Sequence, residues 1–369
     1  MTDVTVKKEV AARVHPYQKK DVPLYDHEWI RLDRNESRFG ISPHVRQAVQ
    51  SELENISSYP ENTGIRLCRS IAQYYHLDKD YVLIGNGSFE LLWLIASVYL
   101  DQDTESILSS PTFGWYKTYG SLFGGKVKEV PLINDDLDLE GLLKNITEKT
   151  KLIWLCNPNN PTGRYIPTDQ IESFLKRVPS HIAVVIDEAY LEFIDAYQPQ
   201  ETISLIKSFN NVILLRTFSK FYGLASLRIG YALGNPQMLQ DLFQFRIPPN
   251  HSRIAEAAAI VSIEDIDFQN YIRKQVQKEK TYLYHELSDM GVTYLPTQTN
   301  FLIFQVPGFE SDEVRQRLAE SHVLVKNGNV FHLPHWLRLT IGDHKANTKV
   351  VSVIKQILGK TKNIEKGAE

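Results

Sequence analysis

The chain has 369 residues, of which 43% are hydrophobic and 23% are charged, an ordinary composition for a globular protein of about two domains. The net charge of −3, with lysines and arginines scattered along the sequence, gives no electrostatic reason to expect a nucleic-acid partner. There are only two cysteines, Cys68 and Cys156, so neither a disulfide nor a metal site is expected and a reducing compartment is the simpler interpretation.

The N-terminus and the longest apolar run indicate where in the cell the protein is expected. Residues 1–10 are polar with mixed charge, unlike a secretory signal, and the longest apolar run, 91–100, is too short to span a bilayer. We therefore expect a soluble, cytoplasmic protein of enzyme size.

The first 42 residues are expected to form an extended N-terminal arm. The arm contains Tyr17, a strand candidate at 29–32, and a polar run that includes Asn35 and Glu36. Ser42 suits a helix N-cap and is followed by proline at the first helical position, so a large domain is predicted to begin at residue 43.

Residues 43–247 alternate between helical and strand patterns. The expected strands are 81–84, 106–109, 127–130, 152–156, 183–186 and 212–215, and the expected helices are 43–53, 65–75, 89–100, 115–123, 139–145, 168–176 and 203–208. Near-continuous apolar strands separated by helices indicate an α/β fold, with a mostly parallel sheet covered by helices on both faces. Ligands in such sheets bind at the carboxyl ends of the strands.

Residues 248–369 change to an α+β pattern and are expected to form a smaller C-terminal domain that the arm joins. The expected helices are 255–262, 267–290, 311–319 and 346–358, and the expected strands are 292–295, 301–304, 323–325 and 337–341. The basic tail after Gly359 is expected to be disordered.

The strand at 212–215 leads into a turn that contains Lys220. A lysine is a nucleophile towards carbonyl groups only when its ammonium can lose a proton, which burial and cationic neighbours favour. The hydroxyls of Thr217 and Ser219, together with Arg228, would suit a phosphate held beside it. The alternative is an ordinary solvated lysine at a strand-to-loop junction.

Two other strand ends carry polar groups. Asn157–Gly163 follows the strand at 152–156 and is either a tight turn or a loop whose Asn160 amide donates to a ligand. Asp187 follows the strand at 183–186 and either caps the next helix or holds a heteroaromatic nitrogen protonated, with Tyr190 nearby.

Three further positions have both a structural and a functional interpretation. Gly87 and Ser88 stand between a strand and a helix, a natural seat for phosphate; the third glycine of a dinucleotide site is missing, which argues against a nicotinamide cofactor. Phe113 is either core or a ligand platform. Arg338 interrupts an apolar strand and pairs either with an internal carboxylate or with an anionic substrate.

Together these motifs resemble those of the fold-type-I pyridoxal-phosphate (PLP) enzymes, and most of all the histidinol-phosphate aminotransferase branch of the class I/II aminotransferases. The resemblance covers residues 17–341 and rests on Asn-Pro-Asn-Asn-Pro-Thr-Gly (157–163), Asp-Glu-Ala-Tyr (187–190) and Thr-Phe-Ser-Lys with the following Leu-Arg-Ile-Gly (217–230). Their order is more specific than any one of them alone.

The resemblance implies a role for each site residue. Lys220 would hold PLP as a Schiff base and move the substrate proton, while Asp187 would pair with the ring nitrogen so that the ring remains an electron sink. The remaining cofactor contacts implied are Gly87, Ser88, Phe89, Phe113, Asn160, Tyr190, Thr217, Ser219, Arg228 and, from the other subunit of a homodimer, Tyr59. The implied substrate contacts are Arg338, Lys326, Asn160, Tyr17, Asn35 and Glu36.

The sequence departs from the family pattern at two of these positions, one in each group. Ser88-Phe89-Glu90 replaces Ser-Asp-Glu, and Lys326 stands where a second arginine is common; lysine lacks the bidentate fork of arginine. The prediction is a PLP-dependent aminotransferase acting between an amino acid or amino-alcohol phosphate, nominally histidinol phosphate, and 2-oxoglutarate. The alternatives are an aromatic or specialised amino-acid aminotransferase, a PLP-dependent decarboxylase or oxidase, and a degenerate binding protein.

Overall fold

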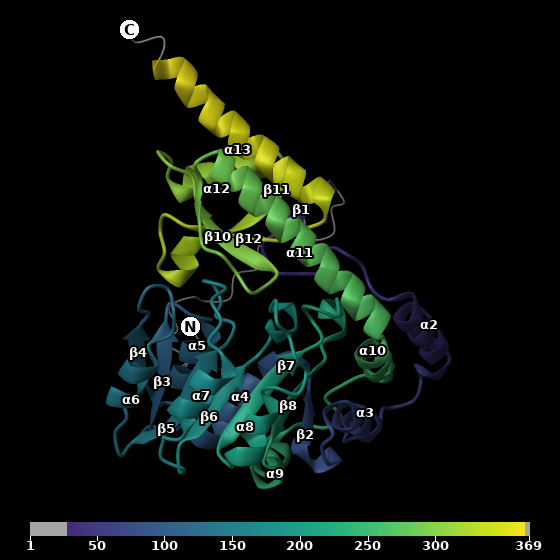
Figure 1. Ribbon diagram of the computed structural model, residues 1–369. Helices are drawn as coiled ribbons and strands as arrows, with labels where there is room; N and C mark the ends of the chain where they lie inside the picture. Colours follow the sequence, from purple (N-terminus) through teal and green to yellow (C-terminus); the bar gives the residue numbers. More distant parts are fainter. Residues whose placement is uncertain (1–27, 366–369) are drawn as a thin grey trace, which may run out of the picture.

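A computed structural model describes residues 28–365, with side chains up to residue 359, and contains two sheets that lie one above the other (Figure 1). The larger sheet has, in spatial order, β2 (Val82–Gly85), β8 (Gly230–Gly234), β7 (Val212–Thr217), β6 (Ala183–Asp187), β5 (Thr150–Cys156), β3 (Glu105–Ser110) and β4 (Lys126–Pro131). Strands β7, β6, β5, β3 and β4 are mutually parallel, and β8 runs antiparallel to both of its neighbours.

The central strands are buried on both faces because alternate side chains enter two separate cores. In β5, Trp154 and Cys156 pack into one core, whereas Ile153 and Leu155 pack into the other. This period of two, combined with apolar residues at nearly every position, is typical of a parallel sheet sandwiched between helices.

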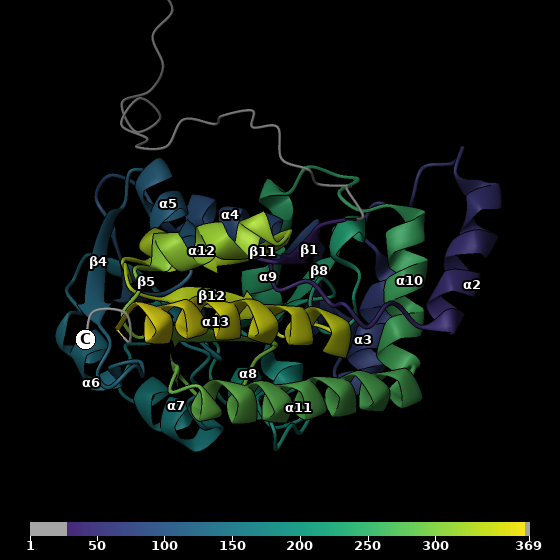
Figure 2. The ribbon, with the colours of Figure 1, turned by 90° about the horizontal axis from the view of Figure 1, so that it is seen from above.

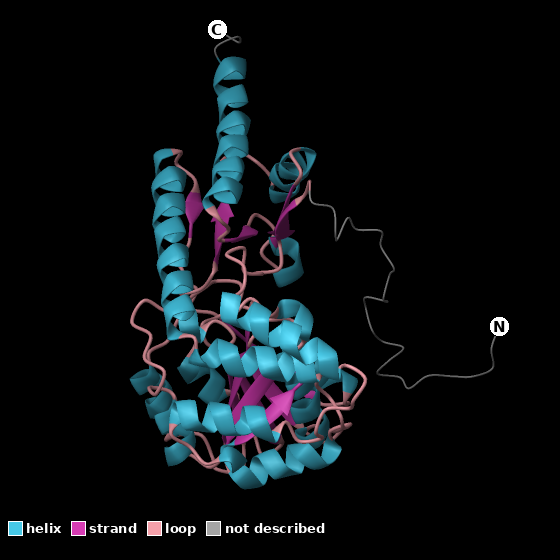
Figure 3. Cartoon of the chain, turned by 90° about the vertical axis from the view of Figure 1, so that its right-hand side faces the viewer, coloured by secondary structure: helices cyan, strands magenta, loops and turns pink. Residues whose placement is uncertain are grey.

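Helices cover both faces of this sheet, as Figure 3 shows. One core receives side chains from α4 (Gly87–Tyr99), α5 (Trp115–Leu122) and α9 (Pro236–Phe245). The other receives them from α3 (Ile65–Tyr75), α6 (Leu139–Lys144), α7 (Thr168–Leu175), α8 (Ile203–Ser208) and α10 (Arg253–Glu264). Helix α2 (Pro43–Glu52) packs against α10. Short 3-10 helices lie at η1 (Leu53–Asn55), η2 (Lys79–Tyr81), η3 (Leu191–Phe193), η4 (Ala225–Leu227) and η5 (Gly328–Phe331).

The smaller sheet joins the two ends of the described chain. Its order is β1 (Ile30–Leu32), β11 (Val323–Asn327), β12 (Leu337–Thr340), β10 (Phe301–Gln305) and β9 (Thr293–Tyr294). Strand β1, from the arm, pairs in parallel with β11. Helix α13 (His344–Glu365) lies between α12 (Ser311–Glu320) and α11 (Ile266–Asp289) when seen from above (Figure 2).

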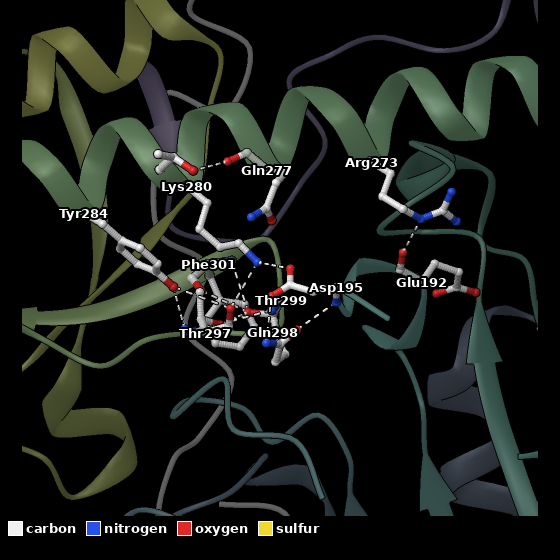
Figure 4. A network of polar contacts seen from close by, with 11 residues as sticks. Glu192, Asp195, Arg273, Gln277, Lys280, Tyr284, Thr297, Gln298, Thr299 and Phe301 are labelled. Atoms are coloured by element: carbon white, nitrogen blue, oxygen red, sulfur yellow. Dashed lines mark hydrogen bonds and ion pairs between the residues drawn. The ribbon is translucent and has the colours of Figure 1, made fainter. Parts of the chain in front are cut away.

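The two sheets are connected by a polar network beneath α11 (Figure 4). The buried ammonium of Lys280 donates to Asp195 at 2.8 Å and to the carbonyl of Thr297 at 3.3 Å. The backbone N–H of Gln298 donates to the carbonyl of Gly163, at the end of the loop after β5, at 2.8 Å. These contacts place the start of β10 directly against that loop.

The α/β fold class predicted from the sequence is confirmed, and most predicted elements lie within a few residues of the observed ones. Strand β8 and helix α9 were not predicted from the sequence. They lie between the turn that contains Lys220 and the two prolines at 248–249. The predicted disorder after Gly359 is wrong for residues 360–365, where α13 continues. No helix within residues 28–365 combines the length and apolar character needed to cross a bilayer.

Candidate active site

The polar motifs meet because three parallel strands end at the same edge of the larger sheet. Cys156 pairs in register with Asp187, and Asp187 pairs with Leu215. The loop after β5, the end of β6 and the turn after β7 are therefore neighbours in space, as the sequence predicts for ligand sites in parallel sheets.

Lys220 is partly buried, and its Nζ donates to the backbone carbonyl of Arg34 in the arm at 2.8 Å. The pKa of Lys220 is lowered to about 8, chiefly by burial and in addition by the charges of Arg338, Arg228 and Arg34, while Glu36 opposes them. The solvated-lysine alternative does not fit these surroundings. An amine with this pKa is partly neutral near physiological pH and can attack a carbonyl carbon.

Asp187 is 5% exposed, and burial raises its pKa to about 6. Oδ2 accepts a hydrogen bond from the Tyr116 hydroxyl at 2.8 Å and Oδ1 accepts one from the backbone N–H of Ala189 at 3.1 Å. Both donors lower the pKa, as does the charge of Lys220. The next helix, η3, has no side-chain cap, so the alternative of a helix-capping Asp187 is wrong. Each carboxylate oxygen retains a lone pair for a ligand.

Arg338 on β12 is buried and faces Asn160. Its Nη1 donates to Asn160 Oδ1 at 2.6 Å and its Nη2 to the carbonyl of Asp33 at 2.9 Å, while Nε has no partner within the described part of the chain. The guanidinium lies 5.3 Å from the ring centroid of Phe301 and 5.1 Å from that of Phe331. Among residues 28–359, the hydrogen-bond partners of Arg338 are an amide oxygen and a backbone carbonyl, and no carboxylate forms an ion pair with it.

The arm supplies a second contact to the site through Asn35. Its Nδ2 donates to the Tyr190 hydroxyl at 2.9 Å, and its backbone carbonyl accepts from Asn300 at 3.1 Å. Tyr190 packs edge-on against Phe301, and burial raises its pKa to about 12 although Arg338 lowers it. The hydroxyl therefore stays protonated at physiological pH and can donate.

A cradle for an anion lies where α4 begins. Gly87 has φ +70° and approaches the Arg228 guanidinium so closely that a Cβ would overlap it. A Cβ on Gly230 would lie 2.7 Å from the backbone nitrogen of Ser88. Arg228 Nη1 lies 3.4 Å from the hydroxyl oxygen of Ser219. Thr217 Oγ1 accepts from the Ser219 N–H at 3.1 Å.

The aromatic residues form a second group beside this cradle. Phe89 packs edge-on against Phe113 at 5.5 Å, and Phe113 packs edge-on against Tyr116 at the same distance. Phe89 therefore packs directly against Phe113, the aromatic residue that is predicted to face the cofactor ring.

Three predicted residues remain to be placed, Lys326, Tyr59 and Tyr17. Lys326 on β11 is the cross-strand partner of Arg338, and burial together with Arg338 lowers its pKa. Tyr59 is 88% exposed, in the loop between η1 and α3. Tyr17 lies outside the described residues.

Tyr116 is a site residue that the sequence reasoning missed. It lies in the first turn of α5, directly after the loop that contains Phe113, and this closeness in sequence was the one local signal for it. Its contact with Asp187 could not be read from the sequence because β6 lies 71 residues away.

The family is decided by a match of residues 27–354 to the model of "Aminotransferase class I and II". The chain belongs to this family. It is 36% identical over 332 residues to the histidinol-phosphate aminotransferase of Geobacillus sp. (strain WCH70), covering 89% of this chain and 90% of that protein. It is 37% identical over 363 residues to that of Bacillus pumilus, covering 95% and 98%.

Among solved structures, that of histidinol-phosphate aminotransferase from Sinorhizobium meliloti in complex with pyridoxal-5'-phosphate superposes with a TM-score of 0.84. It is 27% identical and covers 90% of this chain and 91% of that one. The assignment of this aminotransferase to the fold-type-I PLP-dependent transaminases, made from the sequence, is confirmed.

The residues present also fit the cofactor. The glycine cradle with Arg228 suits its phosphate, the amine of Lys220 suits its aldehyde, and Asp187 suits its ring nitrogen.

Proposed function

We propose that this aminotransferase moves the amino group of histidinol phosphate, or of a closely similar amino-alcohol phosphate, to 2-oxoglutarate. The observation that supports this most is a pair of cations. Lys326 and Arg338 are directly opposite each other on antiparallel strands, where like charges destabilise a sheet. A dianionic phosphate between them would remove that penalty and satisfy the unpartnered Nε of Arg338.

The roles of the other groups follow from their surroundings. PLP, when bound, supplies an electron sink that stabilises the carbanion left when a substrate Cα loses its proton. Lys220, whose pKa is about 8, would accept that proton and return it. Asp187 would keep the ring nitrogen protonated, and Asn160, whose Oδ1 is held by Arg338, would donate through Nδ2 to the ring oxygen together with Tyr190.

The test is a donor screen with 2-oxoglutarate. We expect kcat/KM for histidinol phosphate to exceed that for histidinol, phenylalanine, tyrosine or arginine by at least about 100-fold, since each charge-assisted hydrogen bond to phosphate contributes a few kcal/mol. Lys326→Met should reduce the preference for histidinol phosphate over histidinol and leave the histidinol rate unchanged. A preference for an unphosphorylated donor would overturn the substrate assignment.

A homodimer is part of the same proposal, supported by an exposed apolar surface around Tyr59. This surface consists of Leu53, Ile56, Tyr59, Phe245 and Ile247, which are 49%, 68%, 88%, 57% and 76% exposed. Its two segments are tied together because Arg246 donates to the carbonyl of Asn62. A second copy of the chain would cover these side chains and bring Tyr59 to the neighbouring phosphate cradle.

Mixed dimers distinguish this arrangement from a site contained in one chain. Lys220→Ala and Tyr59→Ala subunits, each inactive or impaired as homodimers, should form one intact site per mixed dimer if Tyr59 crosses over. Recovery of about a quarter of the wild-type activity on statistical mixing is the expected result. No recovery despite verified mixed dimers would place Tyr59 in its own chain's site. The cytoplasmic location stays a prediction.

A further inference from the structure

Tyr116 occupies a position between two predicted cofactor contacts. Its side chain is 1% exposed, its hydroxyl donates to Asp187 Oδ2 at 2.8 Å, and its ring packs edge-on against Phe113 at 5.5 Å. The other face of the ring stacks on Trp154 at 5.2 Å with an interplanar angle of 11°. These two contacts hold the ring in place, so the hydroxyl oxygen is fixed beside Asp187.

The hydrogen bonds of Asp187 show what this hydroxyl does. Each carboxylate oxygen accepts one hydrogen bond, from Tyr116 and from the Ala189 N–H, so the plane of the carboxylate is set from two sides. One acceptor site on each oxygen remains for a ligand N–H. Removal of the hydroxyl would leave only the backbone contact and permit the carboxylate to rotate.

The ionisable groups around Asp187 have opposing effects on its pKa. Glu188 and burial disfavour the carboxylate, and Lys220 is a cation that favours it. Burial raises the pKa of the Cys156 thiol to about 12 and holds that of Tyr116 well above its usual value, so both remain neutral. Tyr116 therefore stabilises the charged form of Asp187 by donation across the physiological range.

We propose that Tyr116 is a positioning residue that holds Asp187 ionised and oriented towards the ring nitrogen of PLP, and at the same time holds Phe113 at the ring face. The proposal rests on the proposed role of Asp187. One side chain of α5 would thus align both Asp187, at the edge of the cofactor ring, and Phe113, at its face.

The test is the affinity of the purified protein, freed of cofactor, for PLP. Tyr116→Phe keeps the ring packing and removes only the hydroxyl, and we expect the Kd for PLP to rise about tenfold or more, as for loss of a hydrogen bond to a charged group. The lower pH limit of PLP binding should also move upward, because Asp187 loses a donor to its charged form. Tyr231→Phe is the matched control, since Tyr231 is also buried and its hydroxyl contacts Tyr75 instead.

A double-mutant comparison separates this inference from the role of Asp187. If both are correct, Asp187→Asn weakens PLP binding strongly and Tyr116→Phe adds little in that background. If Asp187→Asn weakens binding but Tyr116→Phe changes neither the Kd nor its pH limit, the positioning role of Tyr116 is rejected. If Asp187→Asn leaves PLP binding unchanged, the assigned role of Asp187 fails instead.

Discussion

The candidate active site has a floor, formed by Asn160, Asp187 and Lys220 at the carboxyl ends of β5, β6 and β7, and a rim, formed by Asn35, Lys326 and Arg338. The floor comes from neighbouring strands of one sheet and contains one carboxylate and one amine. The rim brings the arm onto the C-terminal strands, as the contact between Arg338 and the carbonyl of Asp33, 305 residues apart in sequence, shows.

The two regions also differ in how their charges are balanced. Beneath the floor, the fully buried Arg216 pairs with Glu188 at 2.8 Å and donates to Thr202 at 2.8 Å. In the rim, Lys326 and Arg338 stand opposite each other, and among residues 28–359 no carboxylate is bound to the guanidinium; the charge of Asp33 offsets the two cations only in part. A paired charge beneath the floor suits a resident cofactor, whereas a net positive rim suits an anionic ligand that comes and goes.

The largest expected effect is in the floor. Lys220→Ala should reduce turnover at least about 1,000-fold, because both the covalent anchor and the proton carrier are lost. Borohydride reduction with PLP followed by mass spectrometry should detect no covalent addition at this position. Lys117→Ala, an exposed lysine on α5, is the control. Wild-type turnover in the Lys220 variant would reject the assignment.

The buried ion pair of Arg216 with Glu188, beneath the floor, should contribute to the free energy of unfolding. Arg216→Met leaves Glu188 buried without its partner, and we expect unfolding in urea to show a loss of about 3–5 kcal/mol. Arg177→Met removes the partner of an exposed carboxylate, Glu140, and should cost far less, because solvent screens this pair. Equal losses in both variants would contradict the difference in burial on which this prediction depends.

The buried carboxylate of the floor predicts a pH dependence in the protein without cofactor. The pKa of Asp187 is about 6, above the ordinary 3.8, so the folded state holds an extra proton between these values and stability falls as pH rises through this window. Asp187→Asn should abolish that decline, so relative to wild type it should gain up to about 3 kcal/mol by pH 7. Parallel pH profiles for the two proteins would show that Asp187 is not the titrating group.

The smallest effect is expected in the rim. Lys326→Arg introduces a bidentate fork opposite Arg338, so the KM for a phosphorylated donor should fall about three- to tenfold. The KM for the unphosphorylated analogue should not change. An equal change for both donors would mean that position 326 does not contact the phosphate.

The sequence by itself determined the α/β class, the strand ends that hold Asn160, Asp187 and Lys220, and the family. The fold class and the strand ends follow from local signals: near-continuous apolar strands, with polar residues placed directly after them. The family follows from the resemblance of the motifs at 157–163, 187–190 and 217–230. The ends of parallel strands must meet at one edge, so the floor could be predicted from one-dimensional patterns.

Only the tertiary structure decided the contacts of Tyr116 with Asp187, of Asn35 with Tyr190 and of Arg338 with Asn160. Each joins segments separated by between 71 and 178 residues. No periodicity specifies such pairs, because they depend on how helices and strands pack once the chain has closed on itself. Desolvation, which shifts the pKa values of Lys220 and Asp187 towards each other, likewise exists only in the folded chain.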